Sequence, residues 1–116
     1  MAFLEMFVGP VPTTSKDVYH AYAAQMGALT MQAGAMSVTA CWGADGPQGV
    51  LSPLAGAVKV DVGETIVARI VRWSSKAARD EGWAAMMKTP DLQAASIPVP
   101  FDRARVCYAA FDELGE

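Results

Sequence analysis

The chain has 116 residues, which is enough for one compact domain, 1–116, and too few for two. Hydrophobic residues make up 53% of it and charged residues 18%, against about 25% charged in an ordinary globular chain, and this excludes an intrinsically disordered protein. Nine lysines and arginines against twelve aspartates and glutamates give a net charge of −3, which argues against nucleic acid as a partner.

The order of apolar residues argues against a membrane protein. No stretch of about 18 apolar residues runs without a charge or a Pro/Gly break, so no membrane span is predicted. The first residues carry Glu5 where a signal peptide would have basic residues, and no apolar stretch there is long enough for its hydrophobic region. We therefore expect a cytoplasmic protein.

The residues that usually bind metals are few. Cys41 and Cys107 lie far apart without Cys-x-x-Cys spacing, which argues against a zinc knuckle or a redox pair, and both are predicted to be buried free thiols. His20 is the only histidine, which excludes paired imidazole ligands for a metal or haem within one chain, and we expect it on the surface. No metal and no cofactor are predicted.

Residues 2–9 are predicted to form a strand, because side chains that are largely apolar alternate onto both of its faces. One face carries Phe3, Glu5 and Phe7, and the other Leu4, Met6 and Val8. A strand that is apolar on both faces belongs in the centre of a sheet, and Pro10 and Pro12 are expected to end it.

A helix is predicted next, with N-caps offered by Thr13, Thr14 and Ser15 and a C-cap by Gly34. Its apolar stripe at helical spacing contains Val18, Tyr19, Tyr22, Met26, Leu29 and Ala33. Such a stripe is typical of a helix that lies on a sheet.

The next segments alternate between strands and turns. Residues 35–42 are predicted to form a strand near a sheet edge, because one of its faces is more polar. The glycines and prolines of 43–53 indicate a loop, and 55–60 and 65–73 are predicted to form a hairpin.

A second helix is predicted after the capping residues Ser74 and Ser75, ending near Lys88. A proline-rich loop follows as far as Pro100, and 106–111 are predicted to form the last strand.

This order of elements favours an α+β ferredoxin-like sandwich, with an antiparallel sheet and both helices on one face. In the usual strand order of this fold, the second and last strands are the opposite edges of the sheet. Both faces of 65–73 are apolar, so one apolar sheet face would stay uncovered. The simplest partner to bury it is a second copy of the chain related by twofold symmetry.

Six short strings stand at characteristic spacing along nearly the whole chain. They are FVGPVP at 7–12, AGA at 33–35, CWG at 41–43 with Asp45, AVK at 57–59, SKAARD at 75–80 and PFDRARVCYAAF at 100–111. Together they resemble the YbaA-like bacterial proteins, a family of unknown function. The resemblance implies a ferredoxin-like protein that pairs as a dimeric α/β barrel, a superfamily that includes cofactor-free monooxygenases, haem proteins and small isomerases, and it implies no established reaction.

The chain also departs from the pattern of the family it resembles. The family usually has Gly at the position of Met6, an acid at Ala40, Phe-Ser-Trp at 68–70 and Asn at Trp83. Several polar groups suited to line a pocket are thus replaced, which leaves open whether the chain shares any chemistry of the family.

Three arginines are candidates for polar contacts with a ligand. Arg79 falls within the apolar arc of the second helix, so we hypothesise that it contacts Asp102 or binds an anionic group of a ligand; the alternative is that it extends into water. For Arg69 and Arg105 we favour the interpretation that both are edge residues that balance acids such as Asp112. The alternative is that both project into the space between paired sheets and orient an anionic or carbonyl-bearing substrate.

Aromatic residues supply the walls of any pocket. They are Trp42, Trp73, Trp83, Tyr108 and Phe111. Such residues serve equally well as core or dimer contacts, and the sequence leaves both readings open.

The function predicted is a homodimeric domain that binds a small organic molecule; if it is an enzyme, we expect a cofactor-free one of monooxygenase-like or isomerase-like type. The ligand-binding candidates are Arg79, Asp102, Arg69, Tyr108, Trp42 and Trp83. The alternative is a non-catalytic dimer for interaction or ligand sensing, and the sequence does not decide whether the protein is an enzyme. A cavity with two or more converging polar side chains would favour the first reading, and a filled apolar core the second.

Overall fold

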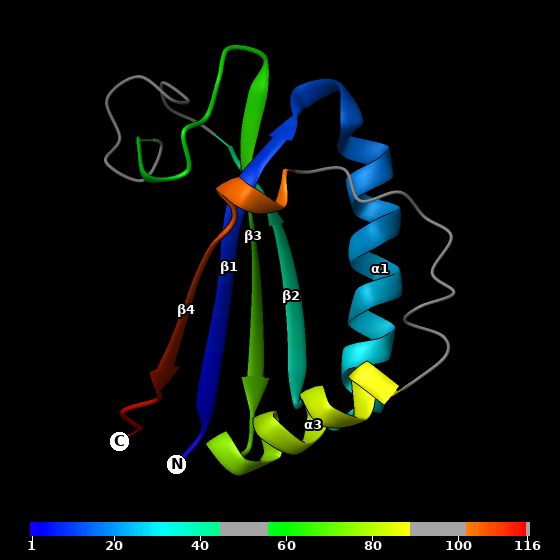
Figure 1. Ribbon diagram of the computed structural model, residues 1–116, viewed down its shortest axis with the longest axis vertical. Coiled ribbons are helices and arrows are strands. Elements are labelled where there is room, and N and C mark those ends of the chain that lie inside the picture. The colour runs from blue at the N-terminus through cyan, green and yellow to red at the C-terminus, as the bar shows by residue number, and fades with distance from the viewer. Residues whose placement is uncertain (45–55, 89–101, 116) are drawn as a thin grey trace.

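The computed structural model describes residues 1–44, 56–88 and 102–115, which form a four-stranded antiparallel sheet in the order β2-β3-β1-β4 (Figure 1). The elements are β1 (Phe3–Pro12), α1 (Lys16–Gln32), β2 (Ser37–Trp42), β3 (Glu64–Trp73), α3 (Lys76–Lys88) and β4 (Cys107–Asp112), with 3₁₀ turns at Thr13–Ser15 and Arg103–Arg105. This arrangement confirms the predicted ferredoxin-like fold, with β2 and β4 at opposite edges. The two ends of the chain meet, since Glu113 N donates to Ala2 O at 2.8 Å.

Both helices pack on one face of the sheet, which we call the helix face. Alternate residues of the central strands point to it, with Phe3, Glu5 and Phe7 on β1 opposite Trp73, Val71 and Arg69 on β3. Two buried clusters form the core between sheet and helices. One contains Phe3, Ala35, Val71 and Trp73, and the other Val11, Tyr19, Ala23 and Val67.

Local signals mark the end of α1 and the start of α3 as predicted, whereas Ser15, the N-cap residue of α1, forms no capping hydrogen bond through its side chain. Gly34 follows the last turn of α1 with φ of 111°, a conformation that glycine adopts without strain. Ser75 caps α3, because its Oγ accepts a hydrogen bond from Ala78 N at 3.0 Å. Gly82 lets α3 approach the sheet closely, since a Cβ there would lie 2.5 Å from Cη2 of Trp73.

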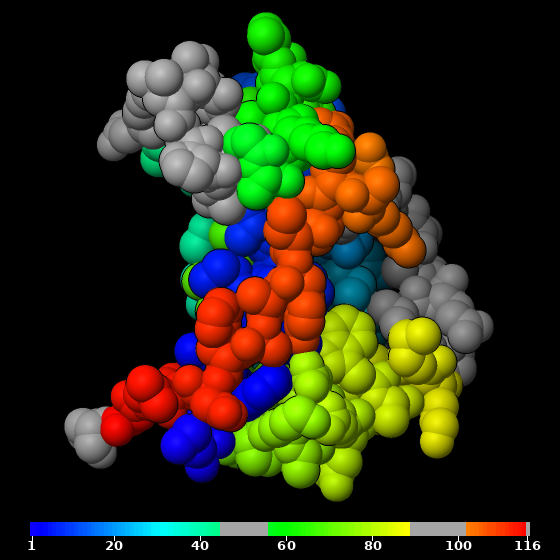
Figure 2. All heavy atoms as spheres, turned by 60° about the vertical axis from the view of Figure 1, so that its left-hand side comes forward, coloured from blue at the N-terminus to red at the C-terminus, as the bar shows by residue number. Residues whose placement is uncertain are grey.

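The opposite side of the sheet, which we call the open face, carries apolar side chains that no described helix covers. It contains Leu4, Met6, Ile66, Ala68, Ile70, Ala109 and Phe111. Figure 2 shows β4 running down the front, α3 on one side of it, and on the other side a hollow where strand residues reach the surface. The apolar face predicted from the sequence is therefore present in the single chain.

Two predictions about strands need correction, one about Pro10 and one about the hairpin. Pro10 lies inside β1 instead of ending it, whereas Pro12 is the last residue of the strand, as predicted. Pro10 fits there because β1 pairs with β4 only up to Val8 and proline is tolerated where a strand has one neighbour. Residues 56–60 form no strand, so the hairpin is wrong; residue 55 lies outside the described part. Most of the predicted loops 43–53 and 89–100 also lie outside it.

The exposure of individual side chains differs from prediction as well. Val18 is exposed, and the buried side of α1 consists of Tyr19, Ala23, Met26 and Thr30. Cys41 and Cys107 are free thiols as predicted, but Cys41 is exposed and Cys107 is half-buried. His20 is exposed, as expected.

Among the described residues no helix is long and apolar enough to cross a membrane.

Candidate functional site

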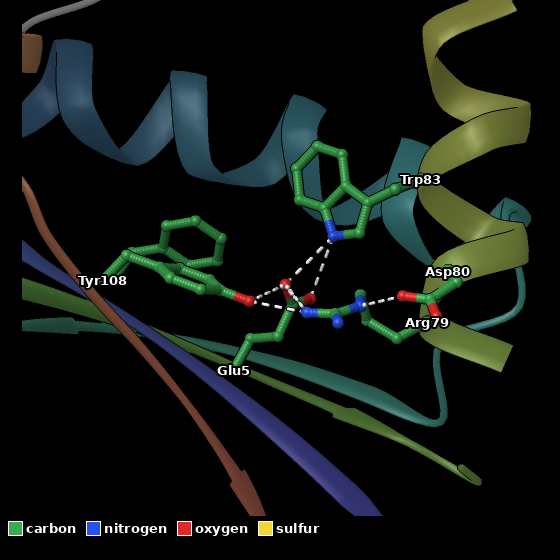
Figure 3. A pocket seen from close by; sticks show the side chains of 6 residues that line it. Glu5, Arg79, Asp80, Trp83 and Tyr108 are labelled. Carbon is green, nitrogen blue, oxygen red and sulfur yellow. Dashed lines mark hydrogen bonds and ion pairs between the residues drawn. The ribbon is translucent and has the colours of Figure 1, made fainter. Parts of the chain in front are cut away.

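A buried carboxylate stands at the centre of the helix face. Glu5 is 1% exposed and accepts hydrogen bonds from two indoles, Trp73 Nε1 at 2.7 Å and Trp83 Nε1 at 3.0 Å. It also accepts one from the hydroxyl of Tyr108 at 2.7 Å, and Arg79 Nη1 lies 3.5 Å from its Oε2 (Figure 3). We call these five residues the Glu5 cluster.

Strand register brings two of the donors to Glu5. Trp73 on β3 lies opposite Phe3, and Tyr108 on β4 lies opposite Phe7. Phe3 and Phe7 are the neighbours of Glu5 on the helix face, two residues before it and two residues after it. The long side chains of Trp73 and Tyr108 therefore reach Glu5 diagonally across the strands.

The other two donors come from α3. Arg79 and Trp83 are four residues apart and therefore on one side of the helix. Because Gly82 lets this helix pack against Trp73, both side chains point down onto the carboxylate (Figure 3). Four secondary-structure elements thus contribute to one cluster.

Tyr108 links the carboxylate to a cation. Its hydroxyl donates to Glu5 and accepts a hydrogen bond from Arg79 Nη1 at 2.7 Å, while Arg79 Nε donates to Asp80 at 2.8 Å. Burial and the hydrogen bond to Glu5 raise the pKa of Tyr108 to about 12. The phenol is therefore protonated at neutral pH, next to a base that can take its proton.

Two hollows meet at this cluster. A shallow depression of 390 Å³ lies above it, lined by Glu5, Phe7, Arg79, Asp80, Trp83 and Tyr108. A larger hollow of 560 Å³, which we call the helix–sheet cavity, shares Phe7, Trp83 and Tyr108 with it and extends to Tyr22, Met26 and Arg69. A volume of about 300–1,000 Å³ is typical of small-molecule sites.

Arg69 lies at the wall of the helix–sheet cavity. The residue is 8% exposed, and its guanidinium carbon stands 4.5 Å from the centroid of the Phe7 ring. Within residues 1–44, 56–88 and 102–115, its Nη1 has no hydrogen-bond partner. Neither interpretation of Arg69 from the sequence is correct. Arg69 lies on the central strand β3 and not at an edge, and its register opposite Phe7 and Ala40 places it on the helix face and not between paired sheets.

The predicted contact between Arg79 and Asp102 is not formed. Asp102 accepts hydrogen bonds from Ala104 N at 2.9 Å and from Arg105 Nε at 3.3 Å. Arg105 in turn pairs with Glu64 at 2.6 Å, and this hydrogen bond lowers the pKa of Glu64. Arg105 therefore balances acids, as we expected from the sequence, with Glu64 in place of Asp112, and neither Asp102 nor Arg105 joins the Glu5 cluster.

The aromatic candidates separate in the same way. Trp83 and Tyr108 line both hollows, whereas Trp42 lines neither and packs against Tyr19 with ring centroids 6.0 Å apart. Glu5, at the centre, was missed as a site residue. The available signal was a carboxylate within an otherwise apolar central strand, which requires buried partners. No group of three potential metal ligands occurs in the described part of the chain.

Comparison with known proteins gives the family. The model of a family described as "Protein of unknown function (DUF1428)" matches residues 2–103. The chain belongs to the DUF1428 family. Its relatives include the uncharacterized YbaA proteins of Escherichia coli K12 and Shigella flexneri, each 32% identical over 114 residues, covering 98% of this chain and 97% of theirs. The resemblance to YbaA-like proteins is thereby confirmed.

Solved structures share the fold of this DUF1428 protein. Rv0793 from Mycobacterium tuberculosis matches with a TM-score of 0.59 and 18% identity, covering 100% of this chain and 98% of that one. A monooxygenase of Streptomyces coelicolor from the gene ActVA-Orf6, solved in complex with the ligand nanaomycin D, matches at 0.57 and 17%, covering 99% and 89%. At such identities the likeness shows the fold alone.

Proposed function

We propose that this DUF1428 protein is a cytoplasmic homodimer that binds a small organic molecule in the helix–sheet cavity. The observation that carries the proposal is the convergence of polar groups from different elements on one aromatic-walled hollow: Tyr22 from α1, Arg69 from β3 and Tyr108 from β4. A filled apolar core, which would favour a purely structural or interaction role, is not what these residues form. The shared fold of a monooxygenase solved with a bound ligand also supports the proposal.

The Glu5 cluster gives the proposed site a group that can move a proton. A ligand that donates an acidic proton to the Tyr108 oxygen would let Tyr108 pass its own proton to Glu5 across 2.7 Å. The balance is one proton moved from the ligand to Glu5, with Tyr108 again a phenol. This is the step that a cofactor-free enzyme of isomerase-like or monooxygenase-like type requires first.

Binding is tested by blocking the cavity with a side chain at its exposed rim. Met87 lines the cavity and is 65% exposed, so Met87→Trp adds bulk without entering the core. The matched control is Met31→Trp, because Met31 is also exposed and lines a separate groove between α1 and β2 instead of the helix–sheet cavity. With the neutral probe 2-naphthamide in isothermal titration calorimetry, we expect Met87→Trp to weaken binding about tenfold or more and Met31→Trp to leave it unchanged. Equal affinities in all three proteins would contradict the proposed site.

Catalysis is tested separately from binding. 2-Tetralone carries exchangeable protons next to its carbonyl, and its deuteration in D2O can be followed by proton NMR. We expect the protein to accelerate this exchange above the buffer rate and Tyr108→Phe to remove the acceleration. Binding without any acceleration would instead favour the non-catalytic ligand-sensing function.

A further inference from the structure

Arg69 is a buried cation without a counter-charge among residues 1–44, 56–88 and 102–115. Arg72, Arg79 and Arg105 each form an ion pair with a carboxylate, whereas no ion pair joins Arg69 to any acid of the described residues. An unpaired charge in the interior lowers stability, because it loses its hydration and gains no opposite charge in return. Such a costly arrangement is typical of a group that is completed by a ligand.

The neighbours of Arg69 leave its N–H groups available. The guanidinium carbon of Arg69 lies 4.5 Å from the centroid of the Phe7 ring. The ring attracts the cation, but it does not accept a hydrogen bond in the guanidinium plane. The nearby acid, Glu5, already accepts from Trp73, Trp83 and Tyr108. Burial raises the pKa of Tyr19, so this phenol is neutral at pH 7 and supplies no negative charge.

We propose that Arg69 binds the carboxylate of a planar, mainly apolar ligand that occupies the helix–sheet cavity. This inference rests on the proposed function and adds the chemical class of the ligand. The cavity offers flat walls from Phe7 and Trp83, and Nη1 of Arg69 is the buried donor that lacks an acceptor in the described lining. One cation suits a monoanion, whereas a phosphate dianion would require several more donors.

Strand register offers an internal substitute for the ligand. Ala40 on β2 lies directly opposite Arg69, on the same face of the sheet. Side chains at such positions have Cβ atoms about 5 Å apart, within reach of an ion pair. An Ala40→Asp change would therefore supply the carboxylate from within the chain and compete with an external one.

The first test compares two probes of equal shape by isothermal titration calorimetry at pH 7. We expect the unchanged protein to bind 2-naphthoate about tenfold or more tightly than 2-naphthamide, since only the former carries the charge. Arg69→Met should remove this preference and keep the affinity for 2-naphthamide. The matched control Lys88→Met removes the same charge from an exposed residue at the end of α3, and we expect it to keep the preference.

The second test uses thermal unfolding without any probe. We expect Arg69→Met to keep or raise Tm, because it removes an unpaired buried charge, and Ala40→Asp to raise Tm and abolish the preference for 2-naphthoate. A fall in Tm of about 5 °C or more in Arg69→Met would overturn the inference, since it would show that Arg69 has a structural partner.

The possible failures are distinguishable. If 2-naphthamide binds and Met87→Trp blocks it while 2-naphthoate shows no preference, the inference about Arg69 is wrong and the proposed function stands. If neither probe binds, or if Met87→Trp has no effect, the proposed function fails and the inference fails with it. Retention of the preference in Arg69→Met would show that another group binds the carboxylate.

Discussion

Tyr108 and Glu5 share a hydrogen bond of 2.7 Å that joins an edge strand to the central strand on the helix face. The same phenol oxygen accepts from Arg79 at 2.7 Å, so β4, β1 and α3 are connected through polar atoms where a small domain ordinarily uses apolar packing alone. The contribution of this hydroxyl to stability can be measured separately from the proton transfer that we propose for it.

Glu5→Gln tests the role of the buried carboxylate in stability. The amide nitrogen cannot accept from an indole or a phenol, and Arg79 loses the negative charge beside it. We expect the free energy of unfolding, measured with urea, to fall by about 2–4 kcal/mol. Glu81→Gln, at an exposed position of α3, is the control and should change it by less than about 0.5 kcal/mol. A small effect of Glu5→Gln would mean that water can replace the lost acceptor.

Tyr108→Phe tests the raised pKa of the phenol. The folded pKa is about 12 against an ordinary value of 10.0, so between these pH values the folded state binds more protons than the unfolded state. The contribution of this phenol to the free energy of unfolding is therefore fully present below pH 10 and is lost as the pH rises to about 12. The phenol is half exposed, so we discount the effect for solvent screening to about 1 kcal/mol.

The measurement for Tyr108 is the difference in urea stability between pH 9 and pH 11.5. We expect the unchanged protein to lose about 1 kcal/mol more than Tyr108→Phe over this range, and the other tyrosines contribute equally to both proteins. Parallel pH profiles would show that the pKa of Tyr108 is ordinary.

The fold was predictable because its signals are local and periodic. Alternation in 65–73 predicted β3 to within one residue, and Ser75 and Gly34 marked helix ends that the structure confirms. The end of β1 was not predictable from Pro10, because a proline in a strand is tolerated or not according to how many neighbours the strand has there. The number of neighbours depends on where β4 stops pairing with β1, and no local pattern in the sequence near Pro10 indicates that point.

The site was less predictable, because its pairing is set by register and helix packing. Arg79 was recognised as a charge that needs a partner, yet its partners are Asp80 and Glu5 and not Asp102. Arg79 reaches Glu5 from α3, which packs closely on the sheet where Gly82 lies against Trp73. The face of Arg69 also depended on register, since a shift of one residue would have moved it to the open face.

Gly82→Ala tests whether this close approach supports the cluster. The new Cβ would lie 2.5 Å from Trp73 Cη2 and 3.1 Å from the backbone oxygen of Ala33, so helix and sheet must separate. We expect the free energy of unfolding to fall by about 1–3 kcal/mol, despite the better helix propensity of alanine. The matched control is Gly27→Ala in α1, where the nearest atom is 3.7 Å away, and it should gain about 0.5–1 kcal/mol. Equal gains in both variants would show that α3 can shift without cost.

The open face supplies the test of the proposed homodimer. Ile70 lies in the middle of this face, opposite Met6 on one side and Thr39 on the other, and it is only half-buried in the single chain. A second copy that covers it would place an introduced charge in a desolvated interface, where it finds no opposite charge. We expect Ile70→Arg to raise the dimer Kd about a hundredfold or more, observed by sedimentation velocity at low micromolar concentration.

Val18→Arg is the control for Ile70→Arg, because Val18 is 42% exposed on α1, away from the open face. It makes the same kind of change, from a β-branched apolar side chain to a cation, and we expect it to leave the dimer intact. If Ile70→Arg also sediments as a dimer, the two copies meet through another surface. If the unchanged protein sediments as a monomer, the apolar open face must be accounted for by a different partner, since isolated domains rarely expose so continuous an apolar surface.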